Sequence, residues 1–344
     1  MKTISHSSAT TAKTCAKKYW FLYVQRIKPD RKSSALYIGT MIAQMTEIND
    51  LIDCPDIPSW CVYEEDIRNF EADYWFAASL FLCYQEYWGD DSLDIVKPEY
   101  EYQAPIYCGT EQHPTYLNVG KCDKLIRKNG KLALLETKTT SADISNDDCD
   151  YWTKLQLDQQ ITNYYVGLNA SGQPVESIIY DVLRKPKLSI GDVNLLDENK
   201  LKIVLDKDGN RVYNKTGKKT PRQTADKEKG YEVQTRPETL EEFALRVTRT
   251  IQKNPSAYFM RKEVPRIQAD LDEYAFELWG MADLLEWREA TGVYERNTSA
   301  CFHYNSKCEF YELCLNGWNP EHEEVPQGFT KKDRVHSELE KGGE

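Results

Sequence analysis

The sequence predicts an α/β fold in which helices flank a mixed central β-sheet, and three observations predict it. The pair Asn129-Gly130 is a strong signal for a tight turn between two strands, because both residue types tolerate positive φ. After this turn, residues 132–135 form a continuous apolar run, which is typical of a strand buried in a sheet. In the middle of the chain the patterns follow the order helix, strand, strand, strand, helix, strand, as in an α/β core.

Helical patterns dominate the part of the chain before this hairpin. Serines and threonines that can cap a helix open a segment at residues 4–27, where apolar residues recur every fourth position. Helical patterns return at residues 35–52 and 66–88. A strand is predicted at residues 96–107, and it contains Glu99.

A helix and a strand are predicted after the hairpin. The helix spans residues 152–168, and the strand spans residues 176–184 and ends at Lys185-Pro186. Residues four apart share one face of a helix, so one face is expected to present the following side chains: Trp152, Gln156, Gln160 and Tyr164. This face could contact a substrate or simply be solvated.

The last third of the chain is more varied. Residues 201–213 read as a second hairpin, and residues 214–230 are rich in lysine and could contact a phosphate backbone. Thr239 and Glu242 form a capping box that starts another helix. We expect five regions: a helical segment at 1–95, the core at 96–190, a basic insertion at 191–235, a helical segment at 236–316 and a charged tail at 317–344.

Composition limits the class of protein. The 344 residues carry a net charge of −11, which argues against a protein that coats DNA non-specifically but not against a nuclease, whose metal site is itself acidic. Apolar runs stay well short of the roughly 20 residues of a membrane span. The first residues also lack the apolar core of a secretion signal. We therefore expect a soluble, cytoplasmic protein that has no contact with a membrane.

Charged residues follow the buried strand of the hairpin directly. Glu136 and Lys138 are two residues apart, so their side chains lie on the same side of the strand, and Asp123 is within reach across the hairpin. Two carboxylates suit a hard divalent metal such as Mg²⁺, with the carbonyl of Thr137 as a further ligand. Lys138 could orient water or offset the charge of a phosphoryl group, which indicates metal-assisted phosphodiester hydrolysis. The alternative is a surface hairpin with a cross-strand ion pair.

The chain has ten cysteines, and four of them stand out as a possible metal site. Cys301, Cys308 and Cys314 lie close together near the end, and Cys15 near the start is the candidate fourth ligand. Without a secretion signal, such a group favours metal ligation over disulfides. A tight zinc-type pair is absent from the sequence, so an iron–sulfur cluster that clips the chain ends together is one reading. His303 as a competing ligand, and buried thiols without metal, are the alternatives.

These residues together resemble the RecB-like branch of the PD-(D/E)xK nucleases, and within it the iron–sulfur exonucleases of phages and CRISPR systems. The family's Gly-x-x-Asp, (Asp/Glu)-x-Lys and Gln-x-x-x-Tyr motifs are matched at Gly120 to Asp123, Glu136 to Lys138 and Gln160 to Tyr164. The family also has one cysteine near the N-terminus and three near the C-terminus, the last pair five residues apart. An upstream glutamate and a Lys-Pro pair complete the match, here at Glu99 and Lys185-Pro186.

The resemblance implies a restriction-endonuclease-like core whose helical N- and C-terminal segments are joined by a Cys₄ metal cluster. It implies these roles: Asp123, Glu136, Lys138 and Gln160 in catalysis, Tyr164 and Lys185 in substrate binding, Mg²⁺ or Mn²⁺ at Asp123, Glu136, Thr137 and Glu99, and a 4Fe–4S cluster, or alternatively Zn²⁺, at Cys15, Cys301, Cys308 and Cys314. The implied function is an exonuclease that processes DNA ends in phage or mobile-element recombination or replication, with a recombination or replication protein as a possible partner.

The chain departs from the family at one position. Members often carry a metal-binding histidine in a Gly-Thr-x-x-His helix motif, but Ala43 stands there in this sequence, with Gln44 beside it and Glu47 after it. Gln44 or Glu99 could complete the metal shell. The departure keeps open a second function, a DNA-binding or recombination-accessory module without catalysis. A third reading is a restriction-type endonuclease.

Overall fold

The computed structural model describes residues 1–31, 33–89, 93–214, 220–303, 306–320, 324–336 and 339. Its centre is a six-stranded mixed sheet in the order β1-β4-β5-β6-β11, with β3 also paired to β4. The strands span β1 Lys2–Ser5, β3 Asp94–Cys108, β4 Glu111–Lys128, β5 Lys131–Thr140, β6 Ser177–Arg184 and β11 Phe259–Glu263. The predicted hairpin is β4 and β5, and the predicted mixed sheet is confirmed.

Strand β4 has three neighbours, and this arrangement creates the site. On one edge it pairs antiparallel with β3 along most of its length. On the other edge β1 pairs with it in parallel as far as Val119, and β5 pairs antiparallel from Lys124 onward. Residues 120–123 therefore lie between these two partners. We call this opening, with residues 136–138 of β5, the fork.

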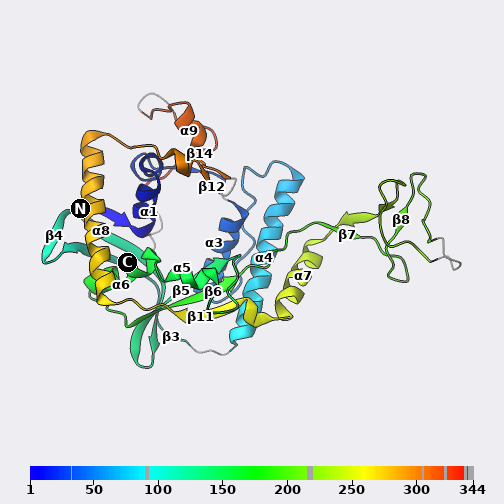
Figure 1. The fold of residues 1–344 in the computed structure, drawn as a ribbon, viewed down its shortest axis with the longest axis horizontal. Coiled ribbons are helices and arrows are strands. Elements are labelled where there is room, and N and C mark those ends of the chain that lie inside the picture. Colours follow the sequence, from blue (N-terminus) through cyan, green and yellow to red (C-terminus); the bar gives the residue numbers. More distant parts are fainter. Residues whose placement is uncertain are drawn as a thin grey trace.

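Helices cover both faces of the sheet (Figure 1). Helices α3 (Ser34–Ile48), α4 (Glu64–Trp88) and α7 (Leu240–Gln252) pack together with Leu183 of β6 on one face. Helices α5 (Asp150–Leu155) and α6 (Gln159–Ala170) pack on the other face, against residues that include Tyr180 and Val182 of β6. Helices α1 (His6–Thr14) and α8 (Gln268–Thr291) form a third cluster around Ile4 and Tyr116, at the β1 end of the sheet.

The helix predicted at 152–168 is two helices in the structure. Asp158 caps α6 by accepting the backbone N–H of Gln160 at 2.7 Å, and the chain is not helical immediately before it. The prediction that Trp152 and Gln156 share a face with Gln160 and Tyr164 is therefore wrong. Spacing by four gave no warning, because an aspartate in a helical pattern can serve as a new N-cap.

The sheet reaches beyond the predicted core range of 96–190. It takes β1 from the N-terminal segment and β11 from the C-terminal segment, so both flanking segments contribute to the core. Within the tail at 317–344, β14 (Phe329–Lys331) pairs with β2 (Ile27–Pro29), while residues 321–323, 337–338 and 340–344 lie outside the described ranges.

Residues 191–238 form an arm that projects from the body of the molecule (Figure 1). Two short ladders build it, β7 (Asp192–Asn194) with β10 (Thr235–Pro237) and β8 (Val204–Leu205) with β9 (Glu232–Val233). Arg246 anchors its base through a 2.6 Å ion pair with Glu238. Residues 215–219, near the start of the predicted lysine-rich stretch, lie outside the described part of the chain.

Short elements complete the described fold: α2 (Ala16–Tyr19), a π-helix at Trp20–Val24, 3₁₀ turns at Pro255–Ala257 and Thr298–Ala300, β12 (Phe302–His303), β13 (Ser306–Lys307) and α9 (Tyr311–Leu315). Among the described residues, every helix is too short or too polar to cross a membrane.

Candidate active site

The fork brings together the two carboxylates that the sequence singles out. Lys124 faces Leu135 in the last pair between the two strands on this side, so Asp123 and Glu136 are the first residues beyond the pairing. The backbone N–H of Thr137 donates a 2.7 Å hydrogen bond to Asp123 Oδ2. Because the N–H and C=O of one strand residue lie on the same edge, the Thr137 carbonyl also lies on the Asp123 side.

Glu136 is almost fully enclosed, with 2% of its surface exposed. Its Oε1 accepts hydrogen bonds from Lys138 Nζ at 2.6 Å and from the Tyr164 hydroxyl at 2.8 Å. Gln160 Nε2 donates to that hydroxyl at 3.0 Å, and so fixes the orientation of Tyr164. Glu136 Oε2 is buried without a hydrogen-bond partner among the described residues. A buried carboxylate oxygen left in this state is unfavourable unless a cation or donor binds it.

The charges at the fork are out of balance. Burial and the neighbouring Glu136 carboxylate raise the pKa of Asp123 to about 7. Burial alone would lower the pKa of Lys138, but Glu136 and Asp123 together raise it, so this lysine stays charged. The Lys138 ammonium thus faces the buried Glu136 and the partly buried Asp123. Lys124 is a second ammonium that lowers the pKa of Asp123. A divalent cation at Asp123 and Glu136 Oε2 would restore the balance, so these residues fit a metal ion with oxygen ligands.

The structure also places three other residues that the sequence predicts for the site, Glu99, Lys185 and Gln44. Glu99 lies on β3 level with Asp123, but its carboxylate forms an ion pair with Lys121. Lys185 Nζ donates to the carbonyl of Ala35 at 3.3 Å and so ties the end of β6 to α3. Ala43 and its neighbour Gln44 are exposed on α3, and Gln44 forms no hydrogen bond to either fork carboxylate in the described structure. The roles of Glu99 and Lys185 stay predictions.

Two tyrosines at the site have no local signal in the sequence. Tyr180 on β6 lies level with Glu136, and Lys138 Nζ is 5.8 Å from the centroid of its ring. Tyr102 on β3 explains the glycine at position 120, because a Cβ there would lie 2.4 Å from the tyrosine hydroxyl oxygen. Both contacts depend on strand register, which single-sequence patterns do not give.

The four predicted cluster cysteines line one pocket of about 750 Å³, together with Lys18 and Arg296 among others. These residues come from opposite ends of the chain. Asn297 joins the two sides, since its backbone N–H donates to Cys15 Sγ at 3.5 Å and its side-chain amide donates to the Thr14 carbonyl at 2.8 Å. No three of the four described sulfur atoms lie within 4.8 Å of one another. The competing ligand His303 has a side chain outside the described residues.

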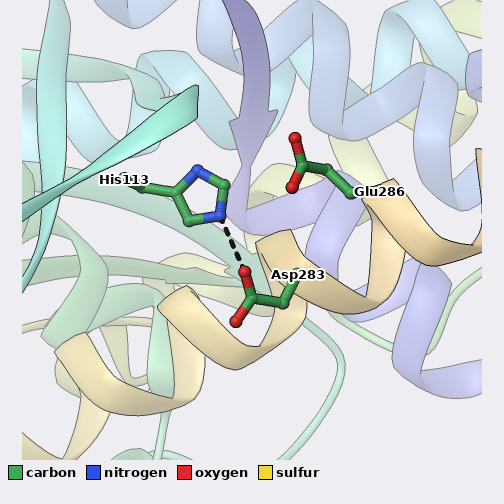
Figure 2. Close-up of side chains that lie close together, drawn as sticks. All are labelled: His113, Asp283 and Glu286. Atoms are coloured by element: carbon green, nitrogen blue, oxygen red, sulfur yellow. Dashed lines mark hydrogen bonds and ion pairs between the residues drawn. The ribbon is translucent and has the colours of Figure 1, made fainter.

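A third group of ligand-type side chains was not predicted. Figure 2 shows His113 beside Asp283 and Glu286 of α8, with one ligand atom from each within 4.8 Å of the others. His113 Nδ1 accepts the backbone N–H groups of Thr115 and Tyr116, each at 3.2 Å. The ring proton therefore lies on Nε2, which donates to Asp283 Oδ1 at 3.2 Å. A metal ion would need the lone pair of Nε2 and would disrupt these bonds, so the group fits a structural His–Asp pair better than a metal site.

Comparison with known proteins identifies the family to which the chain belongs. No curated protein matches the chain. A family model of the PD-(D/E)XK nuclease superfamily matches residues 3–266, from β1 through the fork to the residues just after β11. The match covers most of the chain and contains both fork carboxylates. The chain therefore belongs to the PD-(D/E)XK nuclease superfamily.

Proposed function

We propose that this protein is a metal-dependent exodeoxyribonuclease that trims DNA ends. Membership of the superfamily supports a metal-dependent nuclease with DNA as substrate. One observation carries the assignment of the site, namely that Glu136 Oε2 is buried without a partner beside an Asp123 whose pKa is raised. The restriction to DNA ends, and a setting in phage or mobile-element recombination or replication, rest on the resemblance of the motifs.

Each residue of the fork has a distinct task in this proposal. Asp123, Glu136 and the Thr137 carbonyl would hold Mg²⁺ or Mn²⁺, which when bound polarises the phosphate and makes water a stronger nucleophile. Tyr164 and Lys138 hold Glu136 Oε1, and this leaves Oε2 for the ion. Gln160 keeps Tyr164 in place. Lys138 also offers a positive charge close to the point where the transition state becomes more negative.

We also propose a 4Fe–4S cluster in the cysteine pocket. In a single zinc site, Zn–S bonds of about 2.3 Å in a tetrahedron would put the sulfurs about 3.8 Å apart. No three of the described sulfurs lie within 4.8 Å of one another, which favours a larger group, and Lys18 and Arg296 in the lining complement its negative charge. Protein purified without oxygen should be brown. Colourless protein with stoichiometric zinc would refute this assignment.

Digestion of linear and covalently closed DNA, single- and double-stranded, tests the function. The reaction is run without oxygen, with Mg²⁺ or Mn²⁺, and compares wild type with Asp123→Ala. Degradation of linear DNA alone, lost in the variant, is the expected result. Discrete fragments from closed plasmid would instead indicate a restriction-type endonuclease.

Ala43 stands where the family often has a metal-binding histidine. This departure favours a second function, a DNA-binding or recombination-accessory module with this fold. In that case the protein would bind DNA without divalent metal. It would cleave neither linear nor closed DNA, even with the cluster present in its cysteine pocket. The same digestion, followed by a binding assay in EDTA, separates the two functions.

A further inference from the structure

Helix α1 starts beside the fork. Strand β1 lies on the same edge of β4 as β5, runs toward Asp123 and ends with Ser5 opposite Val119. The chain turns into α1 at the next residue, His6. Reciprocal bonds fix this start, since Ser5 Oγ accepts the Ser8 N–H at 3.2 Å and Ser8 Oγ accepts the Ser5 N–H at 2.9 Å. The start of this helix thus follows directly on the end of β1, next to residues 120–123 of β4.

The imidazole of His6 belongs to the surroundings of the site. It is partly buried, and burial lowers its pKa. The Asp158 carboxylate opposes this effect, and the ammonium groups of Lys138 and Lys13 add to it, so the ring lies within electrostatic reach of Lys138. The ring is therefore neutral at pH 7, with one nitrogen that donates and one that accepts.

A neighbour on α1 lies within reach of the ring. The Thr10 hydroxyl lies 3.4 Å from His6 Nε2 and can donate to it. In the tautomer that carries its proton on Nδ1, Nε2 accepts this bond and Nδ1 is available as a donor, and the neutral ring retains an N–H whether or not Thr10 is present. A neutral donor next to Lys138 adds no repulsion between like charges.

Helix α1 is held firmly against the element that positions Glu136. Lys13 Nζ bonds to Gln159 Oε1 and to Glu277 Oε2, both at 2.9 Å. Gln159 opens α6, and the next residue, Gln160, leads through Tyr164 to Glu136. The position of His6 relative to the carboxylates is thus set by side-chain contacts as well as by the backbone.

We propose that His6 is a further substrate-binding residue of this site, which donates a hydrogen bond to a phosphate oxygen of the DNA strand held at the fork. The proposal rests on the proposed function. A phosphate bound beside Lys138 would lie within reach of His6 at the start of α1, because the Lys138 ammonium acts on this ring. The unpartnered Glu136 Oε2, on which the proposed function also rests, indicates that a ligand completes the site.

The test compares His6→Ala, His6→Gln and Thr10→Ala. Glutamine keeps an N–H donor, and Thr10→Ala changes a neighbour on the same helix that the proposal does not place on the substrate. The first readout is the binding of a fluorescent single-stranded oligodeoxynucleotide in Ca²⁺, which takes the place of Mg²⁺ without supporting cleavage. The second is the single-turnover cleavage rate in Mg²⁺, with Asp123→Ala as the inactive reference. Thermal unfolding and the metal content of the cysteine pocket are measured for every variant.

Loss of one hydrogen bond to a charged phosphate should weaken binding roughly 10- to 100-fold in His6→Ala. We expect His6→Gln to recover most of this loss and Thr10→Ala to behave like wild type. Unchanged binding in His6→Ala overturns the proposal. So does an equal loss in His6→Gln, or a loss that follows a falling melting temperature. If wild type fails to cleave, the proposed function fails, while the binding arm still decides the role of His6.

Discussion

Two groups of side chains in this protein offer ligands that a divalent metal accepts. Asp123 and Glu136 meet at the fork, and His113 meets Asp283 and Glu286 beside α8. At the fork, Glu136 is 2% exposed and one of its oxygens has no partner in the described structure. In the second group the histidine is enclosed and its proton is already shared with Asp283, whose side chain is 58% exposed.

The difference shows what makes a metal site. Ligand-type side chains act on one another in both places, so their grouping alone does not separate the two. Buried charge without compensation does, because it gives a cation a free-energy gain that solvated and mutually paired groups cannot offer. On this argument we propose that the fork binds the catalytic ion and that the His113 group stabilises the contact between β4 and α8.

The largest effect should come from changes that keep the size of the side chains at the fork. We expect Asp123→Asn and Glu136→Gln each to lower the cleavage rate by roughly a thousandfold, because each removes a negative ligand where charge must be balanced in the transition state. Asp283→Asn is the matched control and should cleave like wild type. Single-turnover digestion in Mg²⁺ measures all three. Equal losses in Asp123→Asn and Asp283→Asn would end the distinction between the two groups.

The raised pKa of Asp123 predicts that Asp123→Asn, which should lower the cleavage rate, increases the free energy of unfolding. The folded pKa of about 7 lies above the unfolded value of about 3.9, so the native state binds more protons between them, and the free energy of unfolding falls as pH rises from about 4 to 7. Asp123→Asn abolishes this loss, while its side-chain oxygen can still accept the Thr137 N–H. We expect the variant in EDTA at pH 8 to be more stable than wild type by about 2 to 4 kcal/mol.

Denaturant unfolding at pH 5 and pH 8 measures the difference. The gain should shrink at pH 5, where Asp123 of wild type is protonated, and Mn²⁺ should stabilise wild type but not the variant. Asp283→Asn should show neither behaviour. A variant that is less stable than wild type at pH 8 would mean that the fork is not electrostatically strained.

The sequence predicted the fork because its signals are local. Asp123, Glu136 and Lys138 lie on two strands joined by an Asn-Gly turn, so alternation and turn type were enough to place them together. Gln160 and Tyr164 were found through their spacing on α6, although the helix starts later than expected. The mixed sheet followed from the order of the patterns.

Contacts that depend on register or on distant segments could not be predicted. Tyr180 reaches Glu136 only because β5 and β6 pair in one particular register. His6 and His113 reach their partners across more than a hundred residues, in folds of the chain that no periodicity encodes. An aspartate, Asp158, ended a helical pattern by capping the next helix, and such caps look like ordinary polar residues until the backbone is known.

The two regions also differ in the space around a glycine, Gly120 in the fork and Gly280 on α8. A Cβ at Gly120, in the fork, would lie 2.4 Å from the hydroxyl oxygen of Tyr102, and that hydroxyl already accepts a bond from Asn163 at 2.8 Å. A Cβ at Gly280, on the helix that carries Asp283, meets nothing within 4 Å. We expect Gly120→Ala to lower the free energy of unfolding by about 1 to 3 kcal/mol and Gly280→Ala to raise it by up to about 1 kcal/mol.

Thermal and denaturant unfolding of both alanine variants checks these signs. Gly120→Ala should also lose activity, because the ring of Tyr102 would have to move and the strand that carries Asp123 would move with it. Full activity in a Gly120→Ala protein of unchanged stability would show that β4 has more room at this position than the structure gives it.

The smallest effect belongs to the second group. Asp283 is largely solvated, so its hydrogen bond with His113 contributes little, and Asp283→Asn should change the free energy of unfolding by less than about 1 kcal/mol. His113→Ala should lose more, because the N–H groups of Thr115 and Tyr116 would then lack their acceptor. Neither change should alter the heat of Mn²⁺ binding measured by calorimetry. A binding event lost in Asp283→Asn but kept in Asp123→Asn would place the metal beside α8, and buried uncompensated charge would then no longer distinguish the two groups.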